Sequence, residues 1–155
     1  MHDLRRFLVD YDMAMLRALA QNRGAALKTN IQTEAVDHLV SALLEPLSVR
    51  TALARLSPAA REALERLVAA GGKMHALQFE RDFGQVRPIG PGRLERESAW
   101  QNPENVAEEL RYAGLVFHGF DEDEAGLGAY VFVPGDLLRL LPAPEAGPPS
   151  FELEI

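Results

Sequence analysis

The apolar pattern of this chain changes its period once, and this change limits the fold more than any other feature. In residues 57–83 and 102–112, apolar side chains recur at helical spacing, which is typical of helices that bury one face. After Gly114, two short apolar segments, 115–120 and 129–133, have the composition of strands separated by a turn. The sequence therefore predicts several short helices followed by a two-stranded hairpin.

Local signals set the helix boundaries in this part of the chain. Ser57-Pro58 begins a helix, because serine caps a helix and proline fits its first turn, and Gly71-Gly72 ends it. A further helix is expected at 73–83, and Asn102-Pro103 repeats the cap-then-proline signal that opens another. The segment between these two helices is rich in proline and glycine and is predicted to be a long loop.

Helix, helix, loop, helix and hairpin is the order of a winged helix-turn-helix. Three short amphipathic helices and a hairpin can bury one shared core at this length. The predicted fold class is therefore mainly α with a small β-hairpin, and an unrelated α+β arrangement of the same elements is the alternative. Within the second strand, Val131 and Val133 are expected to face opposite to Tyr130 and Phe132.

The first third of the chain predicts further helices. An apolar stripe runs from Leu4 to Leu19 at helical spacing, with a break near Asp12, which is placed to cap a second helix. Gly24 suits the left-handed position that follows a helix. Thr33 is expected to cap another helix, which Pro46 stops.

A short helix at 48–56 is expected to start the second unit of the chain. The predicted division is an N-terminal helical unit at 1–47, a winged-helix domain at 48–141 and a flexible proline-rich tail at 142–155.

Residues 16–45 combine a helix, a short extended link and a second helix. The residues that match a known pattern are Leu16 and Leu19, Arg23-Gly24 at the helix end, Lys28 and Thr29 in the link, and Val36, Leu39 and Val40 in the second helix. They resemble a SAP-type motif, a small DNA-binding module of chromatin and repair proteins. The second Gly and Lys that are usual in its link are not evident, and a plain helical hairpin is the alternative.

Three stretches carry a wider resemblance: SALLEPLSVRTALARLSPAAREALERLVAAGG, GPGRLERE and ELRYAGLVF. The chain is similar to the N-terminal helicase-associated segments of bacterial proteins related to XPB-type helicases, in which a SAP-like start leads into winged-helix units. This resemblance implies a non-catalytic module in DNA transactions or transcription.

Charge argues against the usual DNA-binding surface of such a domain. The net charge is −7, and residues 101–155 hold two basic and eleven acidic side chains. Binding to phosphates requires Lys and Arg, and like charges about 4 Å apart repel by roughly 1 kcal/mol even in water. We expect the acids of the third helix and of the hairpin turn to meet a basic surface of a partner protein or of a neighbouring domain, or only to keep the chain soluble. The candidates are Glu108, Glu109, Asp121, Glu122, Asp123 and Glu124.

Any nucleic-acid contact is expected on other surfaces. Three basic residues belong to the SAP-like unit and three to the long loop before Trp100, where arginine beside an aromatic ring can stack on bases. Ion pairs with Glu95 and Glu97 are the alternative role for the loop arginines. The nucleic-acid candidates are Arg17, Arg23, Lys28, Arg87, Arg93 and Arg96.

No residue set commits the chain to catalysis or metal binding. Cysteine is absent, the four histidines are isolated, and no glycine loop continues into GK[ST]. The segment DEDEAG resembles the start of a calcium loop, but Ala125 and Phe132 stand where ligands are required. No apolar run approaches the roughly 20 residues of a membrane span. We expect a cytoplasmic, non-catalytic protein with no cofactor, no metal and no membrane contact.

Three hypotheses follow. The first is a winged-helix module for protein–protein interaction, and the alternative is a DNA-binding accessory domain that uses the SAP-like unit and the arginine loop. An enzyme with a site of another kind is the third. Pairing of two copies through the first helix, and a longer protein of which this chain is a fragment, are left open.

Overall fold

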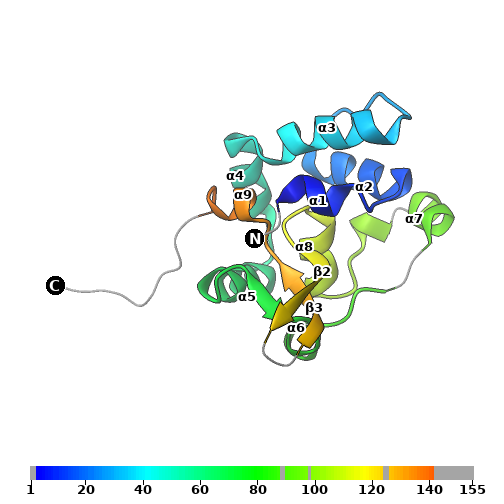
Figure 1. Ribbon diagram of the computed structural model, residues 1–155. Helices are drawn as coiled ribbons and strands as arrows, with labels where there is room; N and C mark the ends of the chain where they lie inside the picture. Colours follow the sequence, from blue (N-terminus) through cyan, green and yellow to red (C-terminus); the bar gives the residue numbers. More distant parts are fainter. Residues whose placement is uncertain (1–2, 88–89, 98, 124–125, 142–155) are drawn as a thin grey trace.

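The computed structural model describes residues 3–87, 90–97, 99–123 and 126–141. Within them the protein is mainly helical, with a small three-stranded antiparallel sheet (Figure 1). The predicted tail at 142–155, Glu124 and the side chain of Asp123 lie outside the described residues. Among the helices of the described segments, none combines the length and the apolar character that crossing a bilayer requires.

The elements follow one another along the chain as α1 (Leu4–Leu8), α2 (Met13–Arg23), α3 (Gln32–Leu43), α4 (Pro46–Arg55), α5 (Pro58–Ala69), β1 (Lys73–His75), α6 (Ala76–Phe83), α7 (Pro91–Glu97), the 3-10 helix η1 (Ala99–Gln101), α8 (Val106–Tyr112), β2 (Phe117–Asp123), β3 (Gly126–Phe132) and α9 (Gly135–Leu138).

Several predicted helix boundaries are confirmed. The Asp12 carboxylate accepts a hydrogen bond from the Met15 amide at 2.9 Å and so separates α1 from α2. Gly24 follows α2 with φ 74°, a left-handed conformation that glycine adopts without strain. Ser57 caps α5 through its hydroxyl, and Pro58 is the first residue of that helix. These signals are local, which is why the sequence alone reveals them.

Other boundaries are corrected. Helix α3 begins at Gln32 after Ile31, which makes no side-chain cap, so Thr33 lies inside the helix. Pro46 does not only stop the preceding helix: it opens α4, with Glu45 as its cap. The helix expected from Asn102-Pro103 begins later, because the Asn105 side chain accepts from the Glu108 amide and caps α8.

The predicted helix at 73–83 is wrong over its first three residues, which form strand β1. This strand pairs antiparallel with β3, so the strand order is β1-β3-β2. The predicted long loop contains α7 and η1. Strand β2 runs on to Asp123, so three of the four consecutive acids lie in a strand and not in the turn.

The sheet is buried on both faces along its inner half. Val131 and Val133 pack with residues of α5, α6 and α8, whereas Tyr130 and Phe132 pack with α1, α2 and α3. The prediction that these two pairs face opposite ways is confirmed. The predicted N-terminal unit therefore shares a core with the sheet of the second unit, and α8 lies between the two sets of helices (Figure 1).

Helix α1 lies across the sheet through the ring of Phe7. The centroid of this ring is 5.3 Å from those of Phe117 and Phe132, and it packs over Gly119. A Cβ atom at Gly119 would stand 3.1 Å from the Phe7 ring, so glycine permits this close approach. The apolar side chains of the first helix, the candidate surface for pairing of two copies, are thus buried within one chain.

Candidate functional site

Helix α8 occupies the position of the predicted recognition helix, and each of its seven residues is buried or half-buried. Ala107 and Leu110 face the core formed with α5 and α6. Tyr112 faces the other core, beside α2 and α3, and is 3% exposed. Both sides of the helix are therefore covered by the chain itself.

Glu108 is fully buried, which corrects the expectation that it belongs to an exposed acidic face. Its carboxylate accepts bonds of 2.8 Å from both Nε and Nη2 of Arg87, and it also accepts from the Arg87 and Glu104 amides. Arg87 further lies 3.2 Å from the Glu104 carboxylate. This ion pair joins the loop after α6 to α8, so the Arg87 guanidinium is bound by carboxylates of the chain itself.

The surroundings of Glu108 keep it ionised. Burial alone would raise the pKa of this carboxyl, but the hydrogen bonds from the Arg87 side chain and from the two backbone amides outweigh burial and lower it. The same hydrogen bond raises the pKa of Arg87. Both groups are therefore charged at neutral pH, and the pair is a structural part of the fold.

Glu109 also makes internal contacts. Its carboxylate accepts 2.8 Å bonds from both the amide and the hydroxyl of Ser57, at the start of α5. This residue thus fixes α8 against α5, and its charge is satisfied within the chain. Of the six acidic candidates, the two on the third helix are engaged in packing, so the structure does not gather all six on one surface.

Arg23 is the second nucleic-acid candidate that serves the fold. Its guanidinium donates to the carbonyl oxygens of Leu43 and Ala113, at 2.9 and 3.0 Å, and to the Ser48 hydroxyl. Burial lowers its pKa to about 10, partly offset by Glu45. The residue therefore ties the end of α2 to α3, α4 and α8.

The remaining basic candidates lie nearer the surface. Helix α7 packs against α2, which brings Arg93 and Arg96 onto a helix that neighbours Arg17. Arg93 pairs with Glu97 at 3.0 Å, as the ion-pair alternative predicted, while Arg96 and Lys28 are exposed. The nearby Trp100 packs partly buried against the N-terminal core, so it serves as an anchor.

The outer half of the hairpin carries exposed apolar side chains that the sequence reasoning missed. Phe120 and Leu127 are 68% and 73% exposed. Phe120 pairs with Ala129 and Leu127 with Glu122, so all four lie on the sheet face that carries Val131 further in. The sequence signal for this surface was Phe120, an aromatic residue that directly precedes the run of acids.

The acids of β2 differ in their surroundings. Asp121 lies on the opposite face from Phe120 and pairs with Lys73 of β1 at 3.0 Å. The Lys73 ammonium also stands 4.8 Å from the centre of the Tyr130 ring. Glu122 is exposed beside Leu127. The described part of this face is therefore an exposed apolar surface with one adjacent carboxylate.

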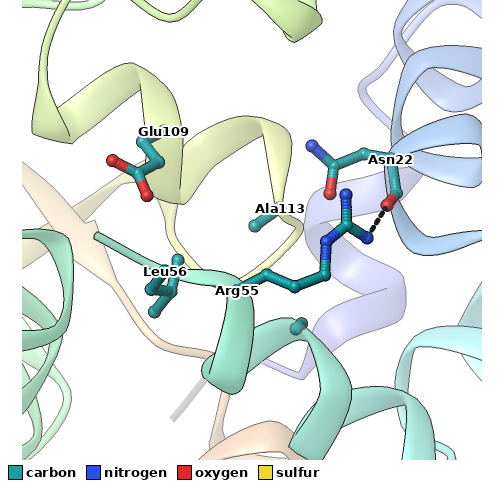
Figure 2. Close-up of a pocket in the computed structure, with 6 residues that line it drawn as sticks. Asn22, Arg55, Leu56, Glu109 and Ala113 are labelled. Carbon is teal, nitrogen blue, oxygen red and sulfur yellow. Dashed lines mark hydrogen bonds between the residues drawn. The ribbon is translucent and has the colours of Figure 1, made fainter. Parts of the chain in front are cut away.

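A small pocket lies between α2, α4 and α8 (Figure 2). Arg55 extends toward Asn22 and donates to its backbone carbonyl at 3.0 Å, while Glu109 lies on the other side of the pocket and is held by Ser57. The charged side chains of the pocket, Arg55 and Glu109, thus both make hydrogen bonds within the chain. Within the described residues, no group of three or more His, Asp or Glu side chains is placed to hold a metal ion.

Comparisons of this chain with protein-family models, with curated proteins and with solved structures found no match. The function is therefore argued from two features of the molecule itself. These are the covered position of α8 and the exposed apolar face of the hairpin, which we define as Phe120, Glu122, Leu127 and Ala129 and call the hairpin face.

Proposed function

We propose that this chain is a non-catalytic winged-helix module that binds a protein partner through the hairpin face, in DNA transactions or transcription. The winged-helix assignment is supported by the element order α5, β1, α6, α8, β2, β3 and by the strand order β1-β3-β2. In this interpretation β1 is the short strand between the first two helices, and β2 and β3 form the wing.

The observation that carries the proposal is the burial of α8. A helix-turn-helix protein reads DNA by laying one helix in the major groove, so that its side chains reach the base edges. Here the two sides of α8 pack into the two cores, and Glu108 on it is fully buried by the loop that contains Arg87. Docking in the ordinary pose would require removal of these contacts, so the proposal assigns another use to the scaffold.

The hairpin face supplies the surface for that use. Phe120 and Leu127 are large apolar side chains exposed to water, and the Glu122 carboxylate lies beside them. Such a surface is typical of a protein-binding site, because a bound protein would bury the apolar side chains. The acidic composition of β2 favours a partner with Lys or Arg in the contact.

A capture experiment tests the proposal. The full chain is immobilised and crosslinked to proteins of its native extract, alongside the double variant Phe120→Ser/Leu127→Ser. Leu47→Ser is the matched control, because Leu47 is 63% exposed on α4, away from the hairpin. We expect a defined partner that is retained by the control and lost by the double variant. Equal capture by all three proteins contradicts the proposal.

The alternative function, a DNA-binding accessory domain, is favoured by one observation. The packing of α7 on α2 places Arg17, Arg93 and Arg96 on neighbouring helices. Binding to duplex and single-stranded DNA is measured as salt is varied. DNA binding predicts that affinity falls as salt rises. The slope of log affinity against log salt concentration should be smaller by about one in Lys28→Ala, and likewise in Arg96→Ala. Absence of binding at low salt removes this alternative.

A further inference from the structure

We infer, resting on the proposed function, that the partner binds as an added β-strand along the outer half of β2. We further infer that this strand carries an apolar residue and a Lys or Arg two positions apart, on the same face of the strand. The site is the edge of β2 together with Phe120 and Glu122 of the hairpin face.

The position of β2 in the sheet provides the edge. Among the described residues β2 pairs only with β3, so it forms one border of the sheet. In an antiparallel pair, every second residue points its backbone N–H and C=O away from the neighbouring strand, where a further strand can bind them. Helix α1 covers the sheet face of Phe117 and Gly119, whereas Phe120, on the other face of β2, is exposed.

The residues of β2 determine which strand fits. A strand added beside β2 places its side chains in lateral contact with Phe120 and Glu122, which lie on the same face. Beside the ring of Phe120, an aromatic or β-branched side chain buries most area, and beside Glu122, Lys or Arg forms an ion pair. Exposed apolar edges are otherwise avoided in natural sheets, which makes the 68% exposure of Phe120 informative.

Charge favours a basic strand over a second copy of this chain as the partner at the β2 edge. Two β2 edges would bring the exposed Glu122 carboxylates of two copies to the same strand border, and each chain already carries a net charge of −7. Like charges directly opposite in a sheet are destabilising, whereas a cationic strand meets opposite charge along the same edge. Glu122 and the net charge thus oppose self-pairing and favour a strand that carries Lys or Arg beside Glu122.

Two synthetic peptides of nine residues test the inference. In the first, Val and Lys take turns at the positions of one strand face and Thr fills the other face, and in the second Glu replaces each Lys. Binding to the full chain is measured by fluorescence anisotropy, and hydrogen exchange of the β2 amides is followed in parallel. We expect saturable binding of the Lys peptide with slowed exchange in β2, and at least tenfold weaker binding of the Glu peptide. Phe120→Ser and Glu122→Lys should each weaken the Lys peptide tenfold or more, and Leu47→Ser should not.

Three results overturn the inference: no slowed exchange in β2, equal binding of both peptides, or a concentration-dependent dimer that protects β2 without peptide. These results are distinguishable from failure of the proposed function. If the native partner is captured through the hairpin face but the Lys peptide leaves β2 unprotected, strand addition is wrong and the proposed function stands. If capture is independent of the hairpin face while the Lys peptide protects β2, the proposed function alone is wrong.

Discussion

At the scale of single residues, the burial of Glu108 shows that α8 is part of the core and not an exposed acidic helix. Glutamate is rarely buried without a partner, so a sequence with Glu108 and Glu109 in succession is interpreted as an exposed acidic helix. In the structure, Arg87 and Ser57 supply those partners from distant parts of the chain. Nothing in helical periodicity identifies such partners, because the contacts depend on how the loop after α6 folds back.

Glu108→Gln is predicted to lower the free energy of unfolding at pH 7 by about 1.5–3 kcal/mol, because a neutral amide loses the charge-assisted hydrogen bonds from Arg87 and presents an NH2 group to donors that a carboxylate oxygen now accepts. The folded pKa of Glu108 is lowered, so its contribution is present above the unfolded value of 4.5 and is lost as pH falls below it. Urea unfolding at pH 7 and at pH 3.5 measures both effects, with the exposed Glu122→Gln as control. An equal acid dependence in wild type and Glu108→Gln contradicts this account.

His118 gives a second pH dependence, at higher pH. Burial, with a smaller contribution from the Arg111 charge, lowers its pKa from 6.5 to about 4. Because the folded pKa is below the unfolded one, stability is full above pH 6.5 and falls as pH drops from 6.5 towards 4. One pKa unit corresponds to about 1.4 kcal/mol, so the loss amounts to roughly 3 kcal/mol.

His118→Gln is predicted to flatten the decline in stability between pH 6.5 and pH 4. Urea midpoints at these two pH values provide the measurement, and His38→Gln, at an exposed position on α3, is the control. A decline in His118→Gln as steep as in the wild type rejects the assignment to this imidazole.

At the scale of elements, helices with local capping signals could be predicted from the sequence, whereas elements that depend on distant contacts could not. Strong caps and glycines, as at Asp12, Gly24 and Ser57, made α2 and α5 predictable. Strand β1 was missed because three residues are too short for an alternating pattern, and only pairing with β3 makes them a strand. Helix α7 was missed because the prolines and glycines around it outweighed its short apolar pattern.

At the element scale, the contact of Phe7 with the sheet joins α1 to β2 and β3. Phe7→Ala is predicted to destabilise the protein by about 3–5 kcal/mol, because the ring is 6% exposed and packs between α1 and β2. Val9→Ala, at a residue 51% exposed, should change stability little. Thermal and urea unfolding compare the two variants, and equal stabilities would show that α1 is not docked on the sheet.

At the scale of the whole molecule, two cores share one sheet and enclose one helix. The N-terminal helices use the sheet face of Tyr130 and Phe132, and α5 and α6 use the face of Val131 and Val133. The sequence predicted the two faces but not that both would be covered, because alternation shows which residues share a face and not what packs there. The sequence argued against DNA binding because acidic residues lie on α8. In the structure the argument is a different one, since α8 is buried between the two cores.

Titration of the isotope-labelled protein with duplex DNA at low salt, followed residue by residue by NMR, tests the covered position of α8 most directly. The account predicts that the amide signals of Val106–Tyr112 stay unchanged at saturating DNA, even if basic residues of α2 or α7 respond. Saturable shifts along α8 and the adjoining hairpin, with affinity that falls as salt rises, would contradict it.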